Sequence, residues 1–185
     1  DEDERETVTF GEFRHRARLY AAALREQGID SGDRVVVLMP QSIMAMVSFA
    51  AAMMLGAVPA FLAYPNFKVD PAKYRSGLAG VTANLSAKAL VIDPDFPDEM
   101  LDCVALGAET KLIRARNADN REHVAKVPES MQIPPGSLAF IQHSAGTTGL
   151  QKGVALTHAA VLAQIEHLAH ALRIDAARDR IYSWL

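Results

Sequence analysis

The sequence predicts an α/β fold, in which a mostly parallel sheet carries helices on both faces. Two observations support this prediction. Short apolar runs of strand length alternate with longer segments of helical periodicity along almost the whole of the 185-residue chain. Some of these runs, such as Val35–Met39, are apolar at every position, which is typical of parallel strands buried on both faces.

The first helix has clear start and stop signals. Thr9 and Glu12 have the spacing of a capping box, and Val8 and Phe13 are placed to form a hydrophobic staple. Gly28 is expected to end the helix. Apolar residues at helical spacing predict one core-facing stripe, made of Phe10, Phe13, Ala17, Tyr20, Ala21 and Leu24.

The remaining elements follow in alternation, and proline and glycine mark many of their boundaries. Pro71 suits the first turn of a helix, and Thr157 suits an N-cap. The expected strands are Val35–Met39, Ala57–Leu62, Ala89–Ile92, Lys111–Ile113, Leu138–Ile141, Val154–Leu156 and the start of one at Ile181–Leu185. The expected helices run from Ser42 to about Leu55, from Pro71 to about Ser86 (with Tyr74, Leu78, Val81 and Leu85 inward), over Asp98–Leu106, and from Thr157 to about Leu172.

The polar stretch Arg116–Gly136 is predicted to be a long connection rather than a domain boundary. The apolar strand that follows it, Leu138–Ile141, needs the same sheet. We therefore expect a single domain.

Composition excludes several classes of protein. The net charge of -3 and the lack of a basic patch with interleaved aromatic residues argue against nucleic-acid binding. We expect no signal peptide, and the single cysteine, Cys103, excludes an internal disulfide. Cys103 lies in an apolar segment, where we expect a buried structural thiol, and a reducing, cytoplasmic location fits. The chain opens on the acidic run Asp1–Glu6 without a methionine, so we expect residues upstream.

The uncharged run Val35–Phe67 is long enough to span a membrane. Pro40, Gly56 and Pro59 divide it into pieces of strand and helix length, so we predict a buried strand–helix–strand unit and no membrane span.

The loop Ser144–Gly153, with the sequence SAGTTGLQKG, is the most informative stretch of the chain. Its glycines allow close approach of the backbone to a ligand, while hydroxyls, backbone N–H groups and Lys152 suit phosphate oxygens. The loop does not fit the Walker pattern, because two residues separate Gly149 from Lys152 and Gly153 stands where a magnesium-binding hydroxyl would be. It does not fit the dinucleotide pattern G-x-G-x-x-G either.

The loop resembles the phosphate loop of the adenylate-forming superfamily, which includes acyl-CoA synthetases and fatty-acyl-AMP ligases. The typical pattern there is S/T-S/G-G-T/S-T-G-x-P-K-G, from which this chain departs at Gln151 and, more mildly, at Ala145. The resemblance extends to three other blocks, VTFGEFRHRARLYAAAL, GDRVVVLMPQSIMAMVSFAAAMMLGAVPAFL and the closing IYSWL.

The resemblance implies a site and an activity. Ser144, Thr147 and Thr148, with the backbone N–H groups of Gly146 and Gly149, would bind the phosphates of ATP, and Lys152 would offset their charge. Mg²⁺ would accompany the ATP. The enzyme would join a carboxylic acid, expected to be a fatty or other acyl acid, to the α-phosphate with release of pyrophosphate. It would then pass the acyl group to coenzyme A or to the phosphopantetheine of an acyl carrier protein.

Relatives are much longer than this chain and carry a ribose-binding aspartate and a mobile lid with a catalytic lysine. We therefore expect residues 1–185 to be an N-terminal AMP-binding domain fragment, truncated before those parts, inactive alone and without a catalytic side chain of its own. An alternative is a non-catalytic module of the same fold that binds a nucleotide or a partner. A different ATP-dependent kinase is disfavoured, because Gly153 supplies no hydroxyl after Lys152.

Other polar residues suggest no further site. His167 and His170 have a spacing that some metal sites use, but no third ligand is evident, so we predict a solvent-facing edge and no metal site. His143 is expected either to contact ligand or to pack at a strand end. Asp93, Asp95, Asp98 and Glu99 are predicted to form a turn and a helix start. The methionines are predicted to lie in the core, namely Met44, Met46, Met53 and Met54.

Overall fold

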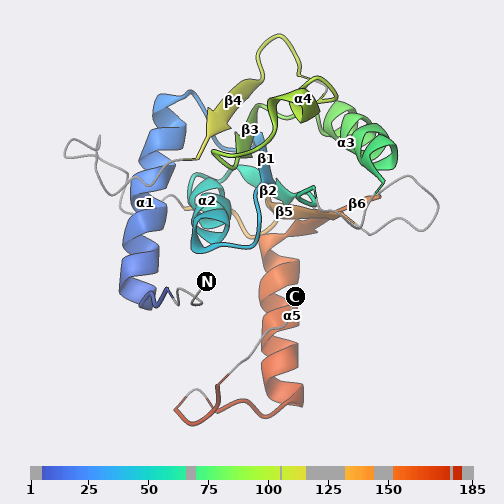
Figure 1. The fold of residues 1–185 in the computed structure, drawn as a ribbon. Helices are drawn as coiled ribbons and strands as arrows, with labels where there is room; N and C mark the ends of the chain where they lie inside the picture. The colour runs from blue at the N-terminus through green and yellow to red at the C-terminus, as the bar shows by residue number, and fades with distance from the viewer. Residues whose placement is uncertain are drawn as a thin grey trace.

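The computed structural model of the chain describes residues 6–65, 70–104, 106–115, 132–143, 152–175 and 177–180. Within these residues, one mixed sheet has the order β4-β3-β1-β2-β5-β6 (Figure 1). All neighbouring strands are parallel except β6, which runs antiparallel to β5. The strands are β1 (Arg34–Leu38), β2 (Val58–Phe61), β3 (Ala89–Ile92), β4 (Lys111–Arg114), β5 (Leu138–His143) and β6 (Gly153–Thr157).

Helices cover both faces of the central strands, which confirms the predicted fold class. The helices are α1 (Phe10–Glu26), α2 (Ile43–Met54), α3 (Pro71–Leu85), α4 (Asp98–Leu101) and α5 (His158–Ala171). α1 and α2 pack together and cover one face, while α3 and α4 lie on the other. α5 projects away from the body of the molecule (Figure 1).

The centre of the sheet is β1, whose alternate side chains supply two separate cores. Val35 and Val37 pack into the cluster under α1 and α2, and Val36 and Leu38 pack into the cluster under α3. All four side chains are fully buried. An apolar residue at every position of the strand is what burial on both faces requires.

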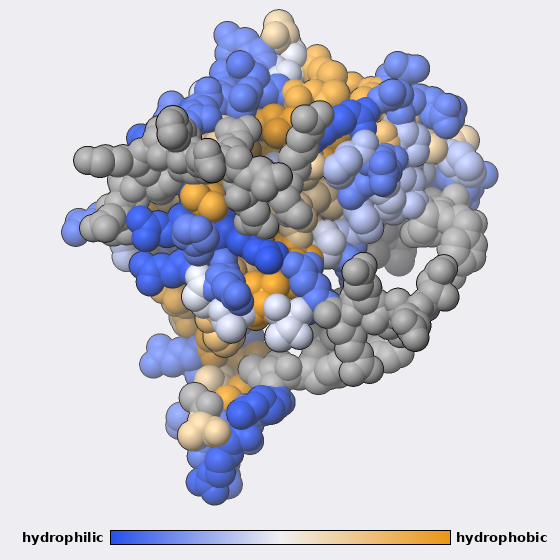
Figure 2. Space-filling view, turned by 60° about the vertical axis from the view of Figure 1, so that its left-hand side comes forward, coloured by the Kyte–Doolittle hydropathy of each residue, from blue (hydrophilic) through white to orange (hydrophobic). Residues whose placement is uncertain are grey.

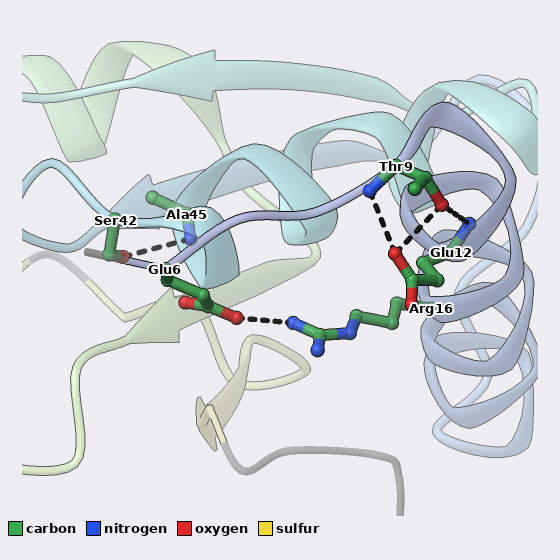
Figure 3. Close-up of polar contacts among 6 residues, drawn as sticks. All are labelled: Glu6, Thr9, Glu12, Arg16, Ser42 and Ala45. Atoms are coloured by element: carbon green, nitrogen blue, oxygen red, sulfur yellow. Dashed lines mark hydrogen bonds and ion pairs between the residues drawn. The ribbon is translucent and has the colours of Figure 1, made fainter. Parts of the chain in front are cut away.

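Local signals fix the ends of the first two helices as predicted. The Thr9 hydroxyl accepts from the Glu12 N–H at 3.2 Å, and the Glu12 carboxylate accepts from the Thr9 N–H at 2.8 Å, which completes the capping box (Figure 3). Glu6 adds an ion pair with Arg16 on the first turns of α1. Gly28 follows the helix with φ of 80°, a conformation that glycine adopts without strain.

The uncharged run folds as the predicted strand–helix–strand unit, with β1, α2 and β2 in succession. The Ser42 hydroxyl caps α2 by accepting from the Ala45 N–H at 3.1 Å (Figure 3). No helix in the described part of the chain is long and apolar enough to cross a membrane.

Several predictions of detail are wrong. Phe10 is 96% exposed instead of buried, because it lies at the very start of α1, where no partner covers it. α4 ends at Leu101 instead of Leu106, and Cys103 is half-buried rather than buried. Met46 is exposed, since it lies on the outer side of α2. β3 has the predicted bounds, and those of the other strands and helices differ from the predicted ones by at most two residues. Ile181–Leu185 lies outside the described residues.

The long connection before β5 does lead back into the same sheet. β4 forms one edge, and the next strand along the chain, β5, pairs with β2 on the opposite side of β1. Most of the connection, residues 116–131, lies outside the described residues.

Candidate functional site

The candidate site lies where the predicted phosphate loop joins the sheet. β5 precedes the loop along the chain and β6 follows it. The two strands pair antiparallel, with His143 opposite Gly153. The described segments end at His143 and resume at Lys152, whose side chain is exposed. The other residues predicted to bind phosphate lie outside the described residues, namely Ser144, Gly146, Thr147, Thr148 and Gly149.

This junction lies at the carboxyl end of β5, which runs parallel to β2 and, through it, to β1. In open α/β sheets, ligands bind outside the carboxyl ends of the parallel strands. The fold therefore positions the two ends of the loop at the edge of the sheet where a ligand is expected.

Gly153 is closely packed at the start of β6. A Cβ atom at this position would lie 3.0 Å from the Ile141 Cγ2 atom and 3.1 Å from the His143 Nε2 atom. Both distances are shorter than ordinary van der Waals contacts, so a larger residue would displace one of the two side chains. The packing of the strand pair therefore favours a glycine at the end of the loop.

His143 is packed at the strand end, which is one of the two positions the sequence left open for it. Its Nδ1 atom is buried and has no hydrogen-bond partner. Burial lowers the pKa of the imidazole, because the charged form is desolvated. The side chain is therefore a neutral ring over a wider range of pH than a solvated histidine.

Three aromatic rings that sequence reasoning missed hold β5 against the central strands. Phe49 of α2 stacks on Phe61 at the end of β2, with ring centroids 4.6 Å apart and an interplanar angle of 8°. Phe49 also contacts Phe140 of β5 in a tilted arrangement at 5.6 Å. The spacing of these residues along the chain carries no signal of the cluster, since each comes from a different element.

Backbone hydrogen bonds anchor the start of α5 directly after β6. The Thr157 hydroxyl accepts from the Ala160 N–H at 3.2 Å, as predicted for an N-cap. The His158 N–H donates to the Ser137 carbonyl oxygen at 3.0 Å, and the Ala159 N–H donates to the Pro135 carbonyl oxygen at 2.8 Å. The β5–β6 pair and the first turn of α5 thus form one connected support for the loop ends.

Comparison with known proteins decides the family. A family model described as "AMP-binding enzyme" matches residues 1–185. The chain belongs to this family.

The chain is also similar to individual curated proteins. It is 29% identical over 183 residues to 4-coumarate–CoA ligase 2 of Nicotiana tabacum, covering 96% of this chain and 32% of that protein. It is 29% identical over 187 residues to acetoacetyl-CoA synthetase of Gallus gallus, covering 87% of this chain and 28% of that protein. The chain thus spans about a third of the length of these relatives.

The fold of the chain matches that of solved enzymes. A structure from a study of fatty acyl-adenylate ligases of E. coli and L. pneumophila aligns with a TM-score of 0.81 and 22% identity, covering 98% of this chain and 31% of that chain. The predicted resemblance to the adenylate-forming ligases is confirmed at the level of family and fold.

Other polar clusters in the described residues have structural roles. Asp93 accepts from the Asp95 N–H at 2.9 Å in the predicted turn, and Asp98 at the start of α4 pairs with Arg114. His167 and His170 are exposed on α5, as predicted. Among the described residues, no group of three His, Cys, Asp or Glu side chains could hold a metal ion.

Proposed function

We propose that this chain is the N-terminal part of an ATP-dependent ligase that activates a carboxylic acid as its acyl-adenylate and then transfers the acyl group to a thiol. The family match supports the ligase class. The observation that carries the proposal is the SAGTTGLQKG motif, which follows β5 directly along the chain and ends at Gly153, the residue paired with His143 at the carboxyl end of β5.

The proposed reaction needs positioning and charge stabilisation more than a reactive side chain. The carboxylate oxygen of the acid attacks the α-phosphorus of ATP, the bond to the bridging oxygen breaks, and pyrophosphate leaves. Hydroxyls of Ser144, Thr147 and Thr148 and the N–H groups of Gly146 and Gly149 would hold the leaving phosphates. Lys152, exposed where the described chain resumes, would offset their charge.

Mg²⁺ would enter with the nucleotide. Mg²⁺ commonly binds through substrate phosphates, water and only one or two protein carboxylates. The absence of a three-residue metal cluster from the described part of the chain is compatible with that mode of binding.

The class of the acid and of the thiol acceptor is proposed from the similar proteins. The names of the similar proteins include CoA ligases and fatty acyl-adenylate ligases, which supports an acyl acid as the substrate and coenzyme A as the acceptor. The phosphopantetheine of an acyl carrier protein is the second acceptor to test. A cytoplasmic location is retained as a prediction from the sequence.

The exposed apolar face of α5 supports the proposal that residues 1–185 are part of a larger domain. No residue of α5 is buried, although apolar residues recur at intervals of three and four and form one stripe. Leu162 and Leu172 are 62% and 64% exposed, and Ile165 and Leu168 are exposed between them. The chain spans about a third of its relatives, so the remaining two thirds would supply the cover.

The decisive experiment measures acid-dependent exchange of labelled pyrophosphate into ATP by the full-length protein that contains this chain, against a panel of carboxylic acids. Exchange with at least one acid is expected, and residues 1–185 alone should show none. Failure of the full-length protein with every acid, together with binding of ATP, would favour the non-catalytic module. Pyrophosphate exchange by residues 1–185 alone would contradict the prediction that this part of the protein is inactive without the rest.

A matched pair of variants tests the loop. Lys152→Ala should weaken adenylation by about tenfold or more, since it removes a charge-assisted contact to phosphate. Gln151→Pro restores the residue that is common in the family and should change the rate less. The opposite order of effects would contradict the role of Lys152.

A further inference from the structure

The contact between His143 and Gly153 points to a role that the phosphate-binding motif does not include. The two residues face each other at the end of the β5–β6 pair, and residues 144–152 connect them. The distance between the two strands at this point therefore sets the span that the phosphate loop has to bridge.

The imidazole of His143 fills the space that a side chain at position 153 would occupy. A Cβ at Gly153 would come within 3.1 Å of Nε2 and 3.6 Å of Cδ2 of the ring. On the other side it would come within 3.0 Å of Ile141 Cγ2, and Ile141 in turn packs against the core under α3. The ring, the glycine and the isoleucine form one contact chain from the loop ends into the core.

A hydrogen bond at Nδ1 does not account for the packing of the His143 ring, because none is formed there. That atom is buried without a partner, which disfavours folding. Desolvation also lowers the pKa of the ring, so the packed form is the uncharged one. The favourable contribution of His143 is therefore its shape in contact with the glycine.

We propose that His143 is a positioning residue, which acts by packing its ring on Gly153 and so fixes the separation of the two ends of the phosphate loop. This inference rests on the proposed function, because the loop is taken to bind ATP. The same contact favours glycine at position 153, since a Cβ there would force the ring or the Ile141 side chain to shift by a few tenths of an ångström.

Four forms of the full-length protein test the proposal, namely His143→Ala, His143→Phe, Gly153→Ala and the double variant. Each is assayed for kcat and for the KM of ATP and of the acid in pyrophosphate exchange. His143→Ala should raise the KM for ATP by about tenfold, since misplacement of a binding group by about 1 Å has effects of this size or larger, and should leave the KM for the acid nearly unchanged. His143→Phe keeps a flat ring and should restore most of the affinity for ATP.

The double variant tests the contact itself. Gly153→Ala should raise the KM for ATP when the ring is present, and should have a smaller effect in the His143→Ala background, where the ring is gone. Independent, multiplicative effects of the two substitutions would overturn the proposal. So would a His143→Phe variant as impaired as His143→Ala, because the nitrogen atoms and not the shape would then matter.

A second measurement keeps this inference separate from the proposed function. Amide hydrogen exchange of Val154 and Gln142 should accelerate in His143→Ala and not in His143→Phe, while Leu156 in the middle of the strand pair stays protected. This pattern of hydrogen exchange is expected even if the protein catalyses no pyrophosphate exchange with any acid. Unchanged protection in His143→Ala would overturn the contact regardless of activity.

Discussion

The centre of the sheet and the projecting α5 are both rich in apolar residues, yet they differ completely in burial. Every residue of β3 is buried, and helices cover both of its faces. α5 has no buried residue and exposes a stripe that includes Leu162 and Leu172. In the space-filling view, α5 and the segment after it form a narrow column below the body (Figure 2). The comparison shows that an apolar pattern predicts the need for a partner and not where along the chain that partner lies.

The largest expected effect comes from truncating one leucine in each region. Leu90→Ala on β3 removes a fully buried side chain and should lower the free energy of unfolding by about 2–5 kcal/mol. Leu162→Ala on α5 should change it by less than about 0.5 kcal/mol, because the side chain is already exposed. Urea unfolding of residues 1–185 measures both. Similar losses in the two variants would mean that α5 packs in solution.

A smaller effect is expected from removing an N-cap in each region. Ser42→Ala at α2 should lower the free energy of global unfolding by about 1 kcal/mol, the usual value for a lost cap. Thr157→Ala removes the same kind of bond from α5, which has no buried residue and is therefore expected to open without disturbing the core.

Amide hydrogen exchange and urea unfolding together distinguish the effects of the two cap variants. Thr157→Ala should accelerate amide hydrogen exchange in the first turn of α5 and leave the midpoint of urea unfolding nearly unchanged. A shift of that midpoint equal to the shift in Ser42→Ala would show that α5 unfolds together with the sheet.

The smallest expected effect is on the loss of folding stability at acidic pH. Hydrogen bonds from Thr9, first from its backbone N–H, lower the pKa of Glu12 below the ordinary 4.5. The N–H of Ala177 and the side chain of Arg178 lower the pKa of Asp175, beyond α5, below 3.8. A carboxylate with a lowered folded-state pKa adds stability above its unfolded-state pKa, and that stability is lost as pH falls through the folded-state value.

The loss for Glu12 should therefore begin below about pH 5 and proceed through its lowered pKa. Glu12→Gln should flatten the fall of global stability with acid, as measured by urea unfolding at a series of pH values. Asp175→Asn should leave that slope unchanged, because Asp175 follows the exposed helix α5, which is expected to open locally. A larger change of this slope in Asp175→Asn than in Glu12→Gln would contradict the expectation that the segment after α5 contributes less to global stability than α1 does.

The sequence predicted those features that depend on neighbouring residues. Thr9 with Glu12, Ser42 and Thr157 were identified as helix starts, and all three cap as expected, since an N-cap bond joins residues only three apart. The strands of the central sheet were predicted to within one or two residues, because full burial leaves an uninterrupted apolar run.

Features that depend on distant partners were not predictable in the same way. Phe10 continues the apolar stripe of α1 but extends past the end of its partner α2. The place of β5 beside β2 depends on Phe49, Phe61 and Phe140, which come from three separate elements. The loop itself was identified by its motif, and of its proposed phosphate ligands only Lys152 lies within the described residues.

The strand order also has a consequence for synthesis of the protein. β1 is made before its neighbours, so the sheet can grow outward on both sides as the chain leaves the ribosome. β2 ends at Phe61, but its second neighbour, β5, begins only at Leu138. At about 5–20 residues per second, this edge of β2 stays unpaired for roughly 4–15 s. During that interval a second nascent chain could add its own strand there, so translation speed across residues 62–137 should affect the yield of correctly paired protein.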